Sequence, residues 1–524
     1  MTHITFTDPN IRSTGTFDVG EHMITAPIIQ ASEAADIVRS TGRSADAYFS
    51  AGKRPLSALQ RSFALWSDPG YPLRREALPT LAALTHFSEA NIACYGLAPL
   101  GEIRLDPERL INLPGELAQL ISSGLYRSFV RWGNGYLRGF GTPHVTYHRM
   151  PNRLLQVLAG NVVGPTWLSV SLGAAIQGPQ IIKLPSRDLA SLMFYLRTLD
   201  EVDPAFRKTI ACGYYPPSDG ASAYLLAQSD LVVAMGSDQS VHAIRRRLSE
   251  LNRRARVISH GFRISFQAIG KAYATPQVAA LAAWGIVAYD GNGCFSPANV
   301  YVEQGGLLSP RQFAETLAAE METLAGVIPP KRTLATAERI TGYRNRQMQR
   351  RLLGEKVTVL KSANTDYTVV LDEEDPRLAP TCQERAVMVK PVKDIRDVSR
   401  YVEHLSQNLQ TVGLAVPSNK LLDIADELAT VGVTSVKPVG LEYTLNMLEP
   451  HDGIFDTVQV YMSDALRWTS VSFTDTDQAI AEAQQVKARA LENGRAASAE
   501  PPGQVESISP PGSELVLAGR GAGR

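Results

Sequence analysis

A cysteine flanked by glycines is the part of this sequence with the clearest chemical potential. Cys294 lies in the stretch Tyr289-Asp-Gly-Asn-Gly-Cys-Phe-Ser-Pro297. Gly291 and Gly293 allow a sharp backbone turn beside the sulfur, and residues 300–302 predict a strand behind the loop. A thiolate displayed in this way can attack a carbonyl or thioester and hold the acyl group, while loop amides stabilise the oxyanion. The alternative is a buried cysteine that packs as a small apolar side chain.

The other cysteines argue against metal or disulfide chemistry. Cys94, Cys212 and Cys382 lie far from Cys294 and from one another, and no CxxC pair occurs. We therefore predict no metal site and no disulfide framework. The first residues show no basic stretch followed by an apolar one, and no segment approaches about 18 uncharged apolar residues. We therefore expect a cytoplasmic protein without a membrane span.

Composition and length set outer bounds on function. The 524-residue chain carries 52 Lys and Arg and 52 Asp and Glu residues, so its formal net charge is zero. Zero net charge gives no general attraction for nucleic acid or for an anionic membrane. The length predicts two or three domains.

The elements that would position the cysteine follow an alternating pattern of strands and helices from residue 154 onwards. This pattern predicts an α/β fold with a doubly wound nucleotide-binding domain over 151–260, followed by a second α/β domain over 261–445 that carries the cysteine. In the first domain, strands are expected at 155–158, 180–183, 209–214, 230–234 and 256–259, and helices at 168–176, 189–199, 220–228 and 238–254. In the second, strands are expected at 300–302, 357–371, 386–392 and 434–439, and helices at 307–325, 331–353, 395–407 and 424–428.

The remaining regions flank these two domains. Residues 1–150 have apolar residues at helical spacing over 56–66, 77–90 and 114–132, so we predict a helical region that packs on the nucleotide-binding domain. Residues 446–484 form a C-terminal return segment. Residues 485–524 turn to Ala, Glu, Arg, Gly, Ser and Pro, a composition that predicts a disordered tail.

Lys183 and the residues after it are the first candidate contacts for a dinucleotide. No GxGxxG follows a predicted strand, so a dinucleotide would be held differently from the usual Rossmann arrangement. Lys183 ends a strand and precedes Ser186, Arg187 and Asp188, at the edge where ligands bind in doubly wound folds. The alternatives are that Lys183 is a solvated charge and that Ser186 or Asp188 caps the next helix.

Gly236 and Ser237 are the second candidate contact. They follow the strand that ends at Ala234 and they begin a helix. Free backbone amides and the helix dipole suit a phosphate at such a position. The alternative is a plain helix cap.

The order of these residues resembles the aldehyde dehydrogenase superfamily, and most closely the long-chain fatty acyl-CoA reductases of bacterial bioluminescence, the LuxC-type branch. The likeness runs from about residue 100 to 470. Its motifs are Leu113-Pro-Gly115, Leu158-Ala-Gly-Asn161, Lys183-Leu-Pro-Ser186, Gly236-Ser-Asp238, Gly261-Phe-Arg-Ile-Ser265, Asn292-Gly-Cys-Phe-Ser-Pro297, Leu409-Gln-Thr-Val412 and His451-Asp-Gly453. The resemblance implies an aldehyde-dehydrogenase-like fold.

The resemblance also implies a role for each candidate residue. Cys294 would be the nucleophile, and the Asn161 amide would stabilise the oxyanion together with the Cys294 backbone N–H. Lys183 would bond the adenosine ribose, and Gly236 and Ser237 would lie against the pyrophosphate. For Asn161, the alternative is a cap on the following helix.

A departure from the superfamily pattern concerns the general base. Ordinary members carry a Glu that activates water to hydrolyse the thioacyl enzyme, whereas this chain has Ser259-His260-Gly261-Phe262 there. Without that carboxylate, hydrolysis is expected to be slow, which favours thioester reduction over aldehyde oxidation. His260 is a candidate substitute acid/base, with a structural histidine as the alternative. His451-Asp452-Gly453 is most simply a turn, and lining of the site is the alternative.

The expected cofactor is NADPH, because Arg187 takes the place of a Glu that binds the ribose hydroxyls in NAD-preferring members. A guanidinium can bind a 2′-phosphate through charge-assisted hydrogen bonds. Leu184 lengthens the run by one residue, and Asp188 is an alternative partner for Arg187. The second superfamily Glu, which holds the nicotinamide ribose, has no counterpart near Glu384.

An arginine-rich helix bears on the question of partners. Its arginines surround an apolar stripe, so a solvated face is the simpler interpretation, and a dock for an acidic acyl carrier protein or for coenzyme A phosphates is the alternative. They are Arg245, Arg246, Arg247, Arg253, Arg254 and Arg256. We expect an acyl-CoA, an acyl carrier or an acyl-protein synthetase as the partner, and a homo-oligomer, either a dimer or a tetramer.

We therefore predict an NADPH-dependent fatty acyl thioester reductase that forms the aldehyde through a thioacyl enzyme on Cys294. Two alternatives stay open. One is an NAD(P)-dependent aldehyde dehydrogenase that works oxidatively, and the other is a non-catalytic scaffold of the same fold.

Overall fold

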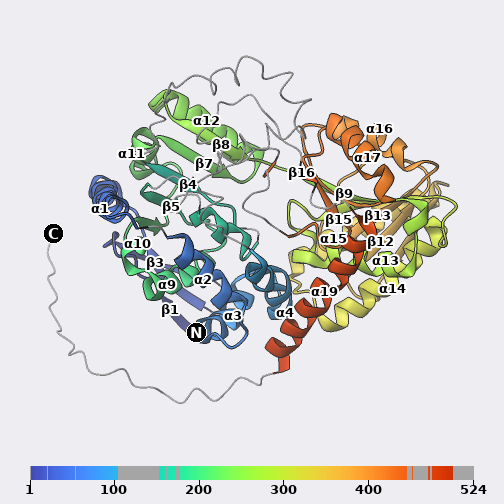
Figure 1. Ribbon diagram of the computed structural model, residues 1–524, viewed down its shortest axis with the longest axis horizontal. Coiled ribbons are helices and arrows are strands. Elements are labelled where there is room, and N and C mark those ends of the chain that lie inside the picture. The colour runs from blue at the N-terminus through green and yellow to red at the C-terminus, as the bar shows by residue number, and fades with distance from the viewer. Residues whose placement is uncertain are drawn as a thin grey trace.

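The structure is a computed structural model of the chain. It describes residues 2–19, 22–53, 55–103, 153–160, 162–171, 178–444, 451–452, 470–471 and 475–499. Two α/β lobes lie side by side, one built around a five-stranded sheet and the other around an eight-stranded sheet (Figure 1). The predicted α/β fold with two sheet-containing lobes is confirmed.

The five-stranded sheet is parallel throughout and has the strand order β6-β5-β4-β7-β8. The chain enters at the central strand β4, winds to one edge and then to the other, which is a doubly wound topology. The carboxyl ends of β4 and β7 therefore form the switch point where such folds bind ligands. The strands are β4 (Leu154–Val157), β5 (Gln180–Lys183), β6 (Ile210–Gly213), β7 (Leu231–Met235) and β8 (Arg256–His260).

Helices cover both faces of this sheet because successive strand residues point to opposite sides. Leu155, Ile181 and Val232 pack with residues of α1, α11 and α12. Ile182 and Cys212 pack on the other face with residues of α9. The bounds are α1 (Ala31–Ser50), η3 (Pro165–Leu168), α9 (Ser191–Val202), α10 (Pro204–Arg207), α11 (Gly220–Gln228) and α12 (Asp238–Leu251).

The arginines on and after α12 face mostly outward, as the apolar stripe predicted. Arg247 is half-buried, and the exposed ones are Arg245, Arg246, Arg253, Arg254 and Arg256. A docking role for this face stays a prediction.

The N-terminal region contains a three-stranded sheet as well as the predicted helices, and helical periodicity gave no sign of that sheet. It continues into the edge of the five-stranded sheet through a parallel bridge between Ile28 and Tyr214. A buried ion pair of 2.8 Å between Asp8 and Arg207 fixes this segment beside β6. The elements are β1 (Thr2–Thr5), β2 (Thr14–Val19), β3 (His22–Pro27), α2 (Leu56–Ser67), α3 (Pro72–Leu84), α4 (Glu89–Asn91), the π-helical turn η1 (Ile92–Leu97) and η2 (Ala98–Glu102). The helix expected over 114–132 lies outside the described residues.

The eight-stranded sheet has the order β11-β12-β13-β10-β9-β14-β15-β16, and only the edge strand β11 is antiparallel to its neighbour among the described strands. Residues 261–263 connect β8 of the first sheet directly to β9 at the centre of the second. The strands are β9 (Ile264–Ile269), β10 (Pro297–Glu303), β11 (Val357–Lys361), β12 (Thr368–Asp372), β13 (Ala386–Val392), β14 (Leu409–Ala415), β15 (Ser435–Pro438) and β16 (Ser470–Val471).

Helix α13 (Pro276–Val287) leads into the loop that carries the cysteine. It is buried along most of its length because its residues are apolar on all sides, so it lies within the core between α14 and the sheet. The other helical elements are η4 (Lys271–Tyr273), η5 (Ala288–Gly291), α14 (Pro310–Val327), α15 (Leu334–Leu352), η6 (Ile395–Asp397), α16 (Val398–Val402), η7 (Glu403–Leu405) and α17 (Ser418–Thr430).

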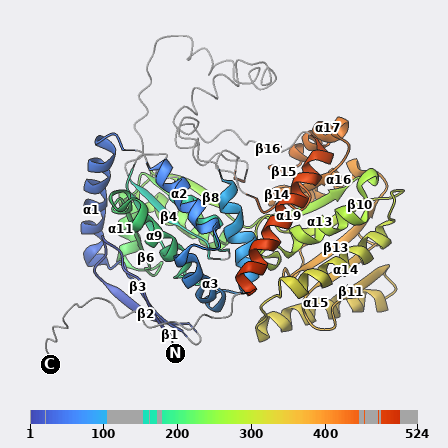
Figure 2. The same ribbon diagram turned by 60° about the horizontal axis from the view of Figure 1, so that its bottom comes forward.

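The prediction of a disordered tail from residue 485 is wrong for its first part. Helix α19 (Thr476–Ala499) continues to residue 499, and Ala479, Ile480, Ala483 and Ala490 are buried on it. Figure 2 shows α19 lying between α4 and the helices of the second lobe, and it contacts η1, α4 and α13. The small alanines that resemble a disordered composition allow this close packing instead.

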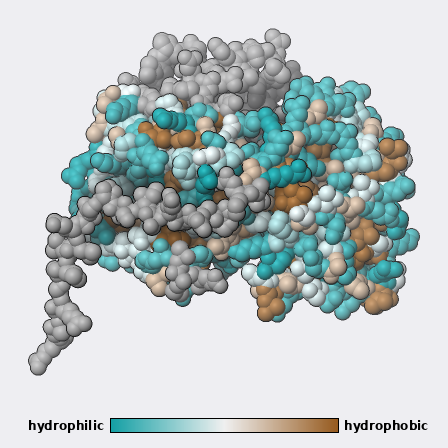
Figure 3. Space-filling model, turned by 90° about the horizontal axis from the view of Figure 1, so that it is seen from below, coloured by the Kyte–Doolittle hydropathy of each residue, from teal (hydrophilic) through white to brown (hydrophobic). Residues whose placement is uncertain are grey.

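The face of the molecule seen in Figure 3 is largely hydrophilic, and its apolar residues form separate patches among the described residues. No described helix is long and apolar enough to cross a membrane.

Candidate active site

Cys294 lies between η5 and β10, at the end of the loop that follows α13. Its side chain is half-buried and packs against the main apolar cluster. The Ser265 hydroxyl donates a 2.8 Å hydrogen bond to the Cys294 carbonyl and accepts one of 3.1 Å from the Thr411 amide. Strands β9 and β14 therefore hold the backbone of the cysteine in place.

The four cysteines differ in accessibility. Cys294 is the one that is not buried. Burial raises the pKa of Cys94 to about 12 and that of Cys382 to about 11, and it raises the pKa of Cys212 well above its usual range. A thiolate is the reactive form, so these three thiols are poor nucleophiles.

The backbone before Cys294 is in an unusual conformation. Tyr289, Asp290 and Gly291 have positive φ angles of 49°, 53° and 74°. A second run at residues 383–385, with φ angles of 61°, 56° and 58°, lies opposite. Residues other than glycine in this region cost about 1–3 kcal/mol each, so surrounding contacts must hold both turns. At Gly291 a side chain would also press on the second turn, since an added Cβ would lie 3.2 Å from the Arg385 nitrogen.

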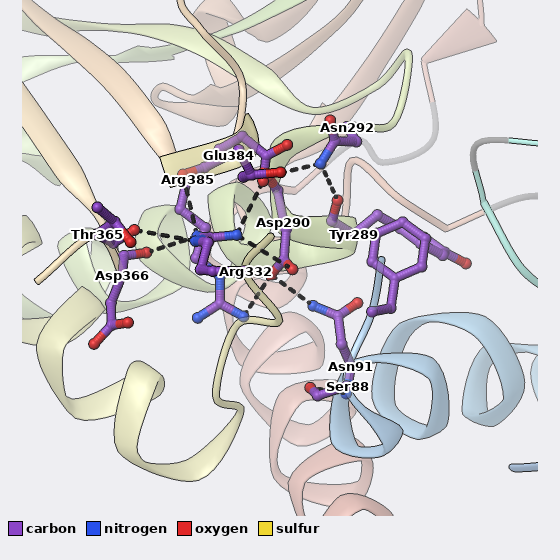
Figure 4. A network of polar contacts seen from close by, with 12 residues as sticks. Ser88, Asn91, Tyr289, Asp290, Asn292, Arg332, Thr365, Asp366, Glu384 and Arg385 are labelled. Carbon is purple, nitrogen blue, oxygen red and sulfur yellow. Dashed lines mark hydrogen bonds and ion pairs between the residues drawn. The ribbon is translucent and has the colours of Figure 1, made fainter. Parts of the chain in front are cut away.

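A buried polar network joins the two turns (Figure 4). The Asp290 carboxylate accepts hydrogen bonds from Arg385 Nε at 2.6 Å and from Asn91 Nδ2 at 3.1 Å. The Arg385 amide also donates to the Asp290 carbonyl at 2.9 Å. Arg332 lies 3.8 Å from the same carboxylate and donates to Glu384 at 2.9 Å. These contacts stabilise the left-handed turn that precedes the cysteine.

His260, at the end of β8, forms a pair with Asp452. Its Nδ1 lies 2.8 Å from Asp452 Oδ2, and its ring stacks on His451 with a centroid distance of 3.9 Å. The other carboxylate oxygen accepts from Gln410 at 2.6 Å and lies 3.2 Å from Arg263 Nε. A carboxylate on one ring nitrogen fixes the tautomer and orientation of the imidazole.

Asp452 is ionised in this arrangement. Burial alone would raise its pKa, but the charge of His451, the His260 hydrogen bond and Arg263 hold the pKa of this carboxyl well below its usual range. Ligand atoms of His260, His451 and Asp452 lie within 4.8 Å of one another, a spacing that suits a metal ion. The Arg263 cation already neutralises the carboxylate, which disfavours a second cation. The expectation of no metal stays a prediction.

Four of the sequence motifs meet at this point of the structure. Ser265 contacts the Cys294 peptide, Thr411 contacts Ser265, and Gln410 contacts Asp452. These residues belong to the stretches 261–265, 292–297, 409–412 and 451–453, which the chain brings together from distant positions. This convergence joins Cys294 and the His260–Asp452 pair through one connected set of contacts.

Lys183 lies half-buried at the carboxyl end of β5. Its ammonium is 5.2 Å from the Tyr214 ring centre and 5.6 Å from that of Tyr215, and Nζ donates to the Leu184 carbonyl at 3.2 Å. Burial lowers its pKa. It is therefore a positioned cation at the ligand-binding edge, and its proposed contact with a ribose stays a prediction.

The residues after Lys183 divide into two kinds. Ser186 and Arg187 are exposed, whereas Asp188 is buried and caps α9 by accepting from the Ala190 and Ser191 amides at 3.2 and 2.9 Å. The sequence offered two candidates for binding the start of this helix, Ser186 and Asp188, and Asp188 is the one that does so. Among the described residues no ion pair joins Arg187 to Asp188, which leaves the guanidinium facing solvent.

Gly236 and Ser237 form the turn between β7 and α12. Ser237 is the N-cap of α12, accepting from the Ser240 amide at 3.2 Å, and Gly236 donates to the His260 carbonyl at 3.0 Å. The helix cap is therefore present. Phosphate binding at this helix N-terminus stays a prediction.

Asn161 and Glu384 are the two remaining residues for which the sequence raised a question of role. Asn161 lies outside the described residues, so its role as oxyanion donor stays a prediction. Glu384 is bound by Arg332 and Arg339, which gives its carboxylate a structural role in the network behind Cys294.

Aldehyde dehydrogenases are among the solved structures with a similar architecture. The chain is similar to the NAD-dependent aldehyde dehydrogenase from Burkholderia multivorans, with a TM-score of 0.54, 15% identity, and coverage of 91% of this chain and 85% of that chain. It is also similar to the Delta-pyrroline-5-carboxylate dehydrogenase from Mycobacterium tuberculosis (TM-score 0.56, 13% identity, coverage 90% and 88%). A third is the NADP-dependent glyceraldehyde-3-phosphate dehydrogenase from Bacillus halodurans, complexed with NADP (0.56, 12%, coverage 83% and 90%). The chain has the aldehyde dehydrogenase fold.

The sequence profile of the acyl-CoA reductase (LuxC) family matches residues 56–461, which is most of the chain. The chain belongs to this family, and it is an oxidoreductase that reduces a fatty acyl thioester to the aldehyde. The predicted resemblance and reaction are thus confirmed. No curated protein sequence is significantly similar to the chain.

Sequence reasoning missed the residues that support the site. Asn91, Arg332 and Arg385 reach Asp290 from distant parts of the chain, and nothing local to those residues indicates the contact. Asp452 was detectable, because the His451-Asp452-Gly453 motif was already singled out. Its pairing with His260 could not be inferred from sequence because 192 residues separate the two.

Proposed function

We propose that the chain performs this reduction with NADPH through a covalent thioacyl intermediate on Cys294. The observation that carries the proposal is that Cys294 is half-buried in a loop where distant motifs meet, while the other three cysteines are buried. Ser265 and Thr411 fix the peptide of the nucleophile without occupying its sulfur. Such fixation favours a reactive geometry because the loop does not have to reorganise.

The first half-reaction is transfer of the acyl group. The Cys294 thiolate forms a bond to the thioester carbonyl carbon, and the carbonyl π electrons move to oxygen. The Asn161 amide and the Cys294 N–H donate hydrogen bonds to that oxyanion. Its collapse breaks the bond to the carrier sulfur, and the carrier thiolate leaves and takes up a proton.

The second half-reaction requires a cofactor at the edge of the five-stranded sheet. NADPH, when bound, supplies the hydride that reduces the thioacyl carbonyl to a thiohemiacetal, which releases the aldehyde and the Cys294 thiolate. The residues present fit such a group. An added Cβ at Gly236 would meet nothing nearer than 3.7 Å, so space is open beside the N-terminus of α12. Lys183 and Arg187 add positive charge at the same edge.

His260 is proposed as the acid/base of the first half-reaction. Asp452 binds its Nδ1, so Nε2 is the ring atom that would exchange protons. The imidazolium would protonate the departing carrier thiolate, and the carboxylate would stabilise that imidazolium. This role depends on ring orientation, which Asp452 supplies.

The same pair favours a second candidate function, oxidation of an aldehyde to an acid. An imidazole held by a carboxylate can activate water, which would replace the missing Glu of ordinary aldehyde dehydrogenases. Rates of aldehyde formation and of acid formation, measured on one preparation with the acyl-CoA and with the aldehyde, separate the two functions. Reduction should be the faster direction, and a faster NADP⁺-dependent acid formation would establish the second candidate.

The covalent step is tested by mass spectrometry of the intact protein after incubation with a fatty acyl-CoA in the absence of NADPH. We expect one acyl adduct, mapped by peptide analysis to residues around Cys294. Cys382→Ala serves as the matched control and should be acylated like the wild type. An adduct at Cys94, Cys212 or Cys382 in place of Cys294 would overturn the proposal.

A further inference from the structure

Tyr289 occupies an unusual place beside the proposed nucleophile loop. Its side chain is fully buried, and its hydroxyl lies 2.7 Å from the Tyr95 carbonyl and 3.1 Å from the Val163 carbonyl. A tyrosine hydroxyl has one hydrogen, so it is shared between these two acceptors. The loop that leads to Cys294 is therefore tied to η1 and to residues 162–164 at the same time.

The two backbones that receive this hydroxyl touch each other. A Cβ added at Gly164 would lie 2.2 Å from the Gly96 carbonyl oxygen, and one added at Gly96 would lie 2.8 Å from the Val163 oxygen. Residues 162–164 directly follow Asn161 in the chain. The Tyr289 hydroxyl thus contacts a closely packed backbone pair, and Val163 in that pair follows the proposed oxyanion donor by two residues in the sequence.

The neighbouring residue is anchored in the opposite direction. Tyr289 and Asp290 are consecutive left-handed residues, and Figure 4 shows their side chains diverging. Asp290 binds Arg385 beside β13 of the second lobe, whereas Tyr289 reaches η1 and residue 163. The Tyr289 ring also packs on Phe295, the residue after the cysteine, at a centroid distance of 5.6 Å.

We propose that Tyr289 is a positioning residue that sets the Cys294 loop at a fixed separation from the segment following Asn161. This inference rests on the proposed function, since it assumes that Cys294 attacks the thioester and that the Asn161 amide receives the oxyanion. The hydroxyl holds residue 163 while the ring holds residue 295. Loss of the Val163 contact would shift the Cys294 loop relative to residues 162–164, and reaction rates depend steeply on such displacements between reacting groups.

The test is Tyr289→Phe, which removes the hydroxyl and keeps the ring. Single-turnover acylation by a fatty acyl-CoA should slow by about 10-fold or more, because the oxyanion is no longer well aligned with its donors. Alkylation of Cys294 by iodoacetamide should be unchanged, since that reaction forms no oxyanion. Tyr195→Phe is the matched control, because it removes a fully buried hydroxyl, bonded to Ser62 at 2.9 Å, and keeps the stacking of the ring on Trp167.

A double-mutant comparison distinguishes positioning from general loss of structure. In an Asn161→Ala background, Tyr289→Phe should cause little further loss of acylation, because the group that it positions is already gone. The inference would be overturned if Tyr289→Phe slowed acylation as much in the Asn161→Ala background as in the wild type. It would also be overturned if Tyr289→Phe alone slowed alkylation and acylation equally. Should Tyr289→Phe not fold, Gly96→Ala decides the matter by displacing the Val163 carbonyl from outside the loop. Slow acylation with normal alkylation then supports the inference, and normal acylation overturns it.

The outcomes also separate this inference from the proposed function. A wild-type protein that forms no adduct on Cys294 contradicts the proposed function itself. A wild type that is acylated, an Asn161→Ala variant that is slow and a Tyr289→Phe variant that is normal contradict only the role of Tyr289.

Discussion

The loop before Cys294 and the cofactor edge of the five-stranded sheet are held by different kinds of contact. Asp290 in the loop is buried and is bound by Asn91, Arg332 and Arg385, which are distant in sequence. At the cofactor edge, Ser186, Arg187 and Ser237 are exposed. Polar contacts at that edge mostly join residues close in sequence, such as the hydrogen bond that the Ser237 hydroxyl accepts from the Ser240 amide three residues later.

This difference indicates that the Cys294 loop is the rigid region and that the cofactor edge is the region where ligand specificity can change. A nucleophile must be held in one geometry, and buried charge pairs hold it because breaking them is costly. A cofactor edge can instead select its ligand through exposed charges that change affinity with little effect on the fold. Substitutions in the loop should therefore change both chemistry and stability, whereas substitutions at the edge should change cofactor choice alone.

The largest effect is expected for Cys294→Ala. Aldehyde formation and covalent labelling should be abolished because no other described thiol is accessible, while NADPH binding should persist because the sulfur does not hold the cofactor. Enzyme assay, mass spectrometry and cofactor titration measure the three properties. Loss of NADPH binding would show that the loop and the cofactor edge are not independent.

Asp290→Ala tests whether buried charge holds the loop. The variant leaves the buried Arg385 guanidinium unpaired, so the free energy of unfolding should fall by about 3–5 kcal/mol. Urea titration measures this loss. Asp36→Ala, which breaks an exposed pair with Arg39, is the control and should cost at most about 1 kcal/mol. Equal losses in the two variants would remove the basis of the comparison.

Glu442→Gln extends the comparison to pH. Glu442 is buried against Gly285 and Gly413 and accepts from Gln267 at 2.8 Å and from the Gly440 amide at 3.0 Å. Burial raises its pKa from the ordinary 4.5 to about 7. The carboxyl is neutral in both the folded and the unfolded state below pH 4.5. As pH rises, the unfolded state releases its proton first, so stability falls until about pH 7.

The variant should not show this loss. Relative to Glu442→Gln, the wild type should lose about 3 kcal/mol of unfolding free energy between pH 4.5 and 7, a rise of about 2.5 pKa units being worth that much. Urea titrations at several pH values measure it, with the exposed Glu315→Gln as control. If the difference in unfolding free energy between the wild type and Glu442→Gln stayed constant across this pH range, the Glu442 pKa would lie near its ordinary value.

The smallest effect is expected at the cofactor edge. Arg187→Glu should lower the preference for NADPH over NADH by about tenfold or more, because a charge-assisted contact with the 2′-phosphate is replaced by repulsion. The ratio of kcat/KM values for the two cofactors measures this change, and added salt should reduce it. Unfolding free energy should not change. Arg254→Glu, on the exposed surface beyond α12, should leave the preference as it is, and an equal shift there would point to long-range charge alone.

Much of the fold followed from local pattern. The strands ending at Lys183 and at Ala234 and the helix at 220–228 were predicted within a residue or two, because apolar runs and turn residues mark them directly. The N-terminal sheet and the buried helix α13 were missed. Short edge strands carry little periodicity, and a helix that is apolar on all sides has no polar face to give it a period.

The amino-acid sequence by itself determined the family and the alternating α/β order, and it predicted Cys294 as the candidate nucleophile, because each depends on residue types at short spacing. The tertiary structure decided what surrounds that nucleophile. Asp290 meets Arg385, His260 meets Asp452 and Tyr289 meets Val163 across separations of 95, 192 and 126 residues. Such contacts depend on how the two sheets are wound and joined. They cannot be inferred from nearby residues, because a buried charge or hydroxyl has the same neighbours in sequence whether or not a distant partner is present.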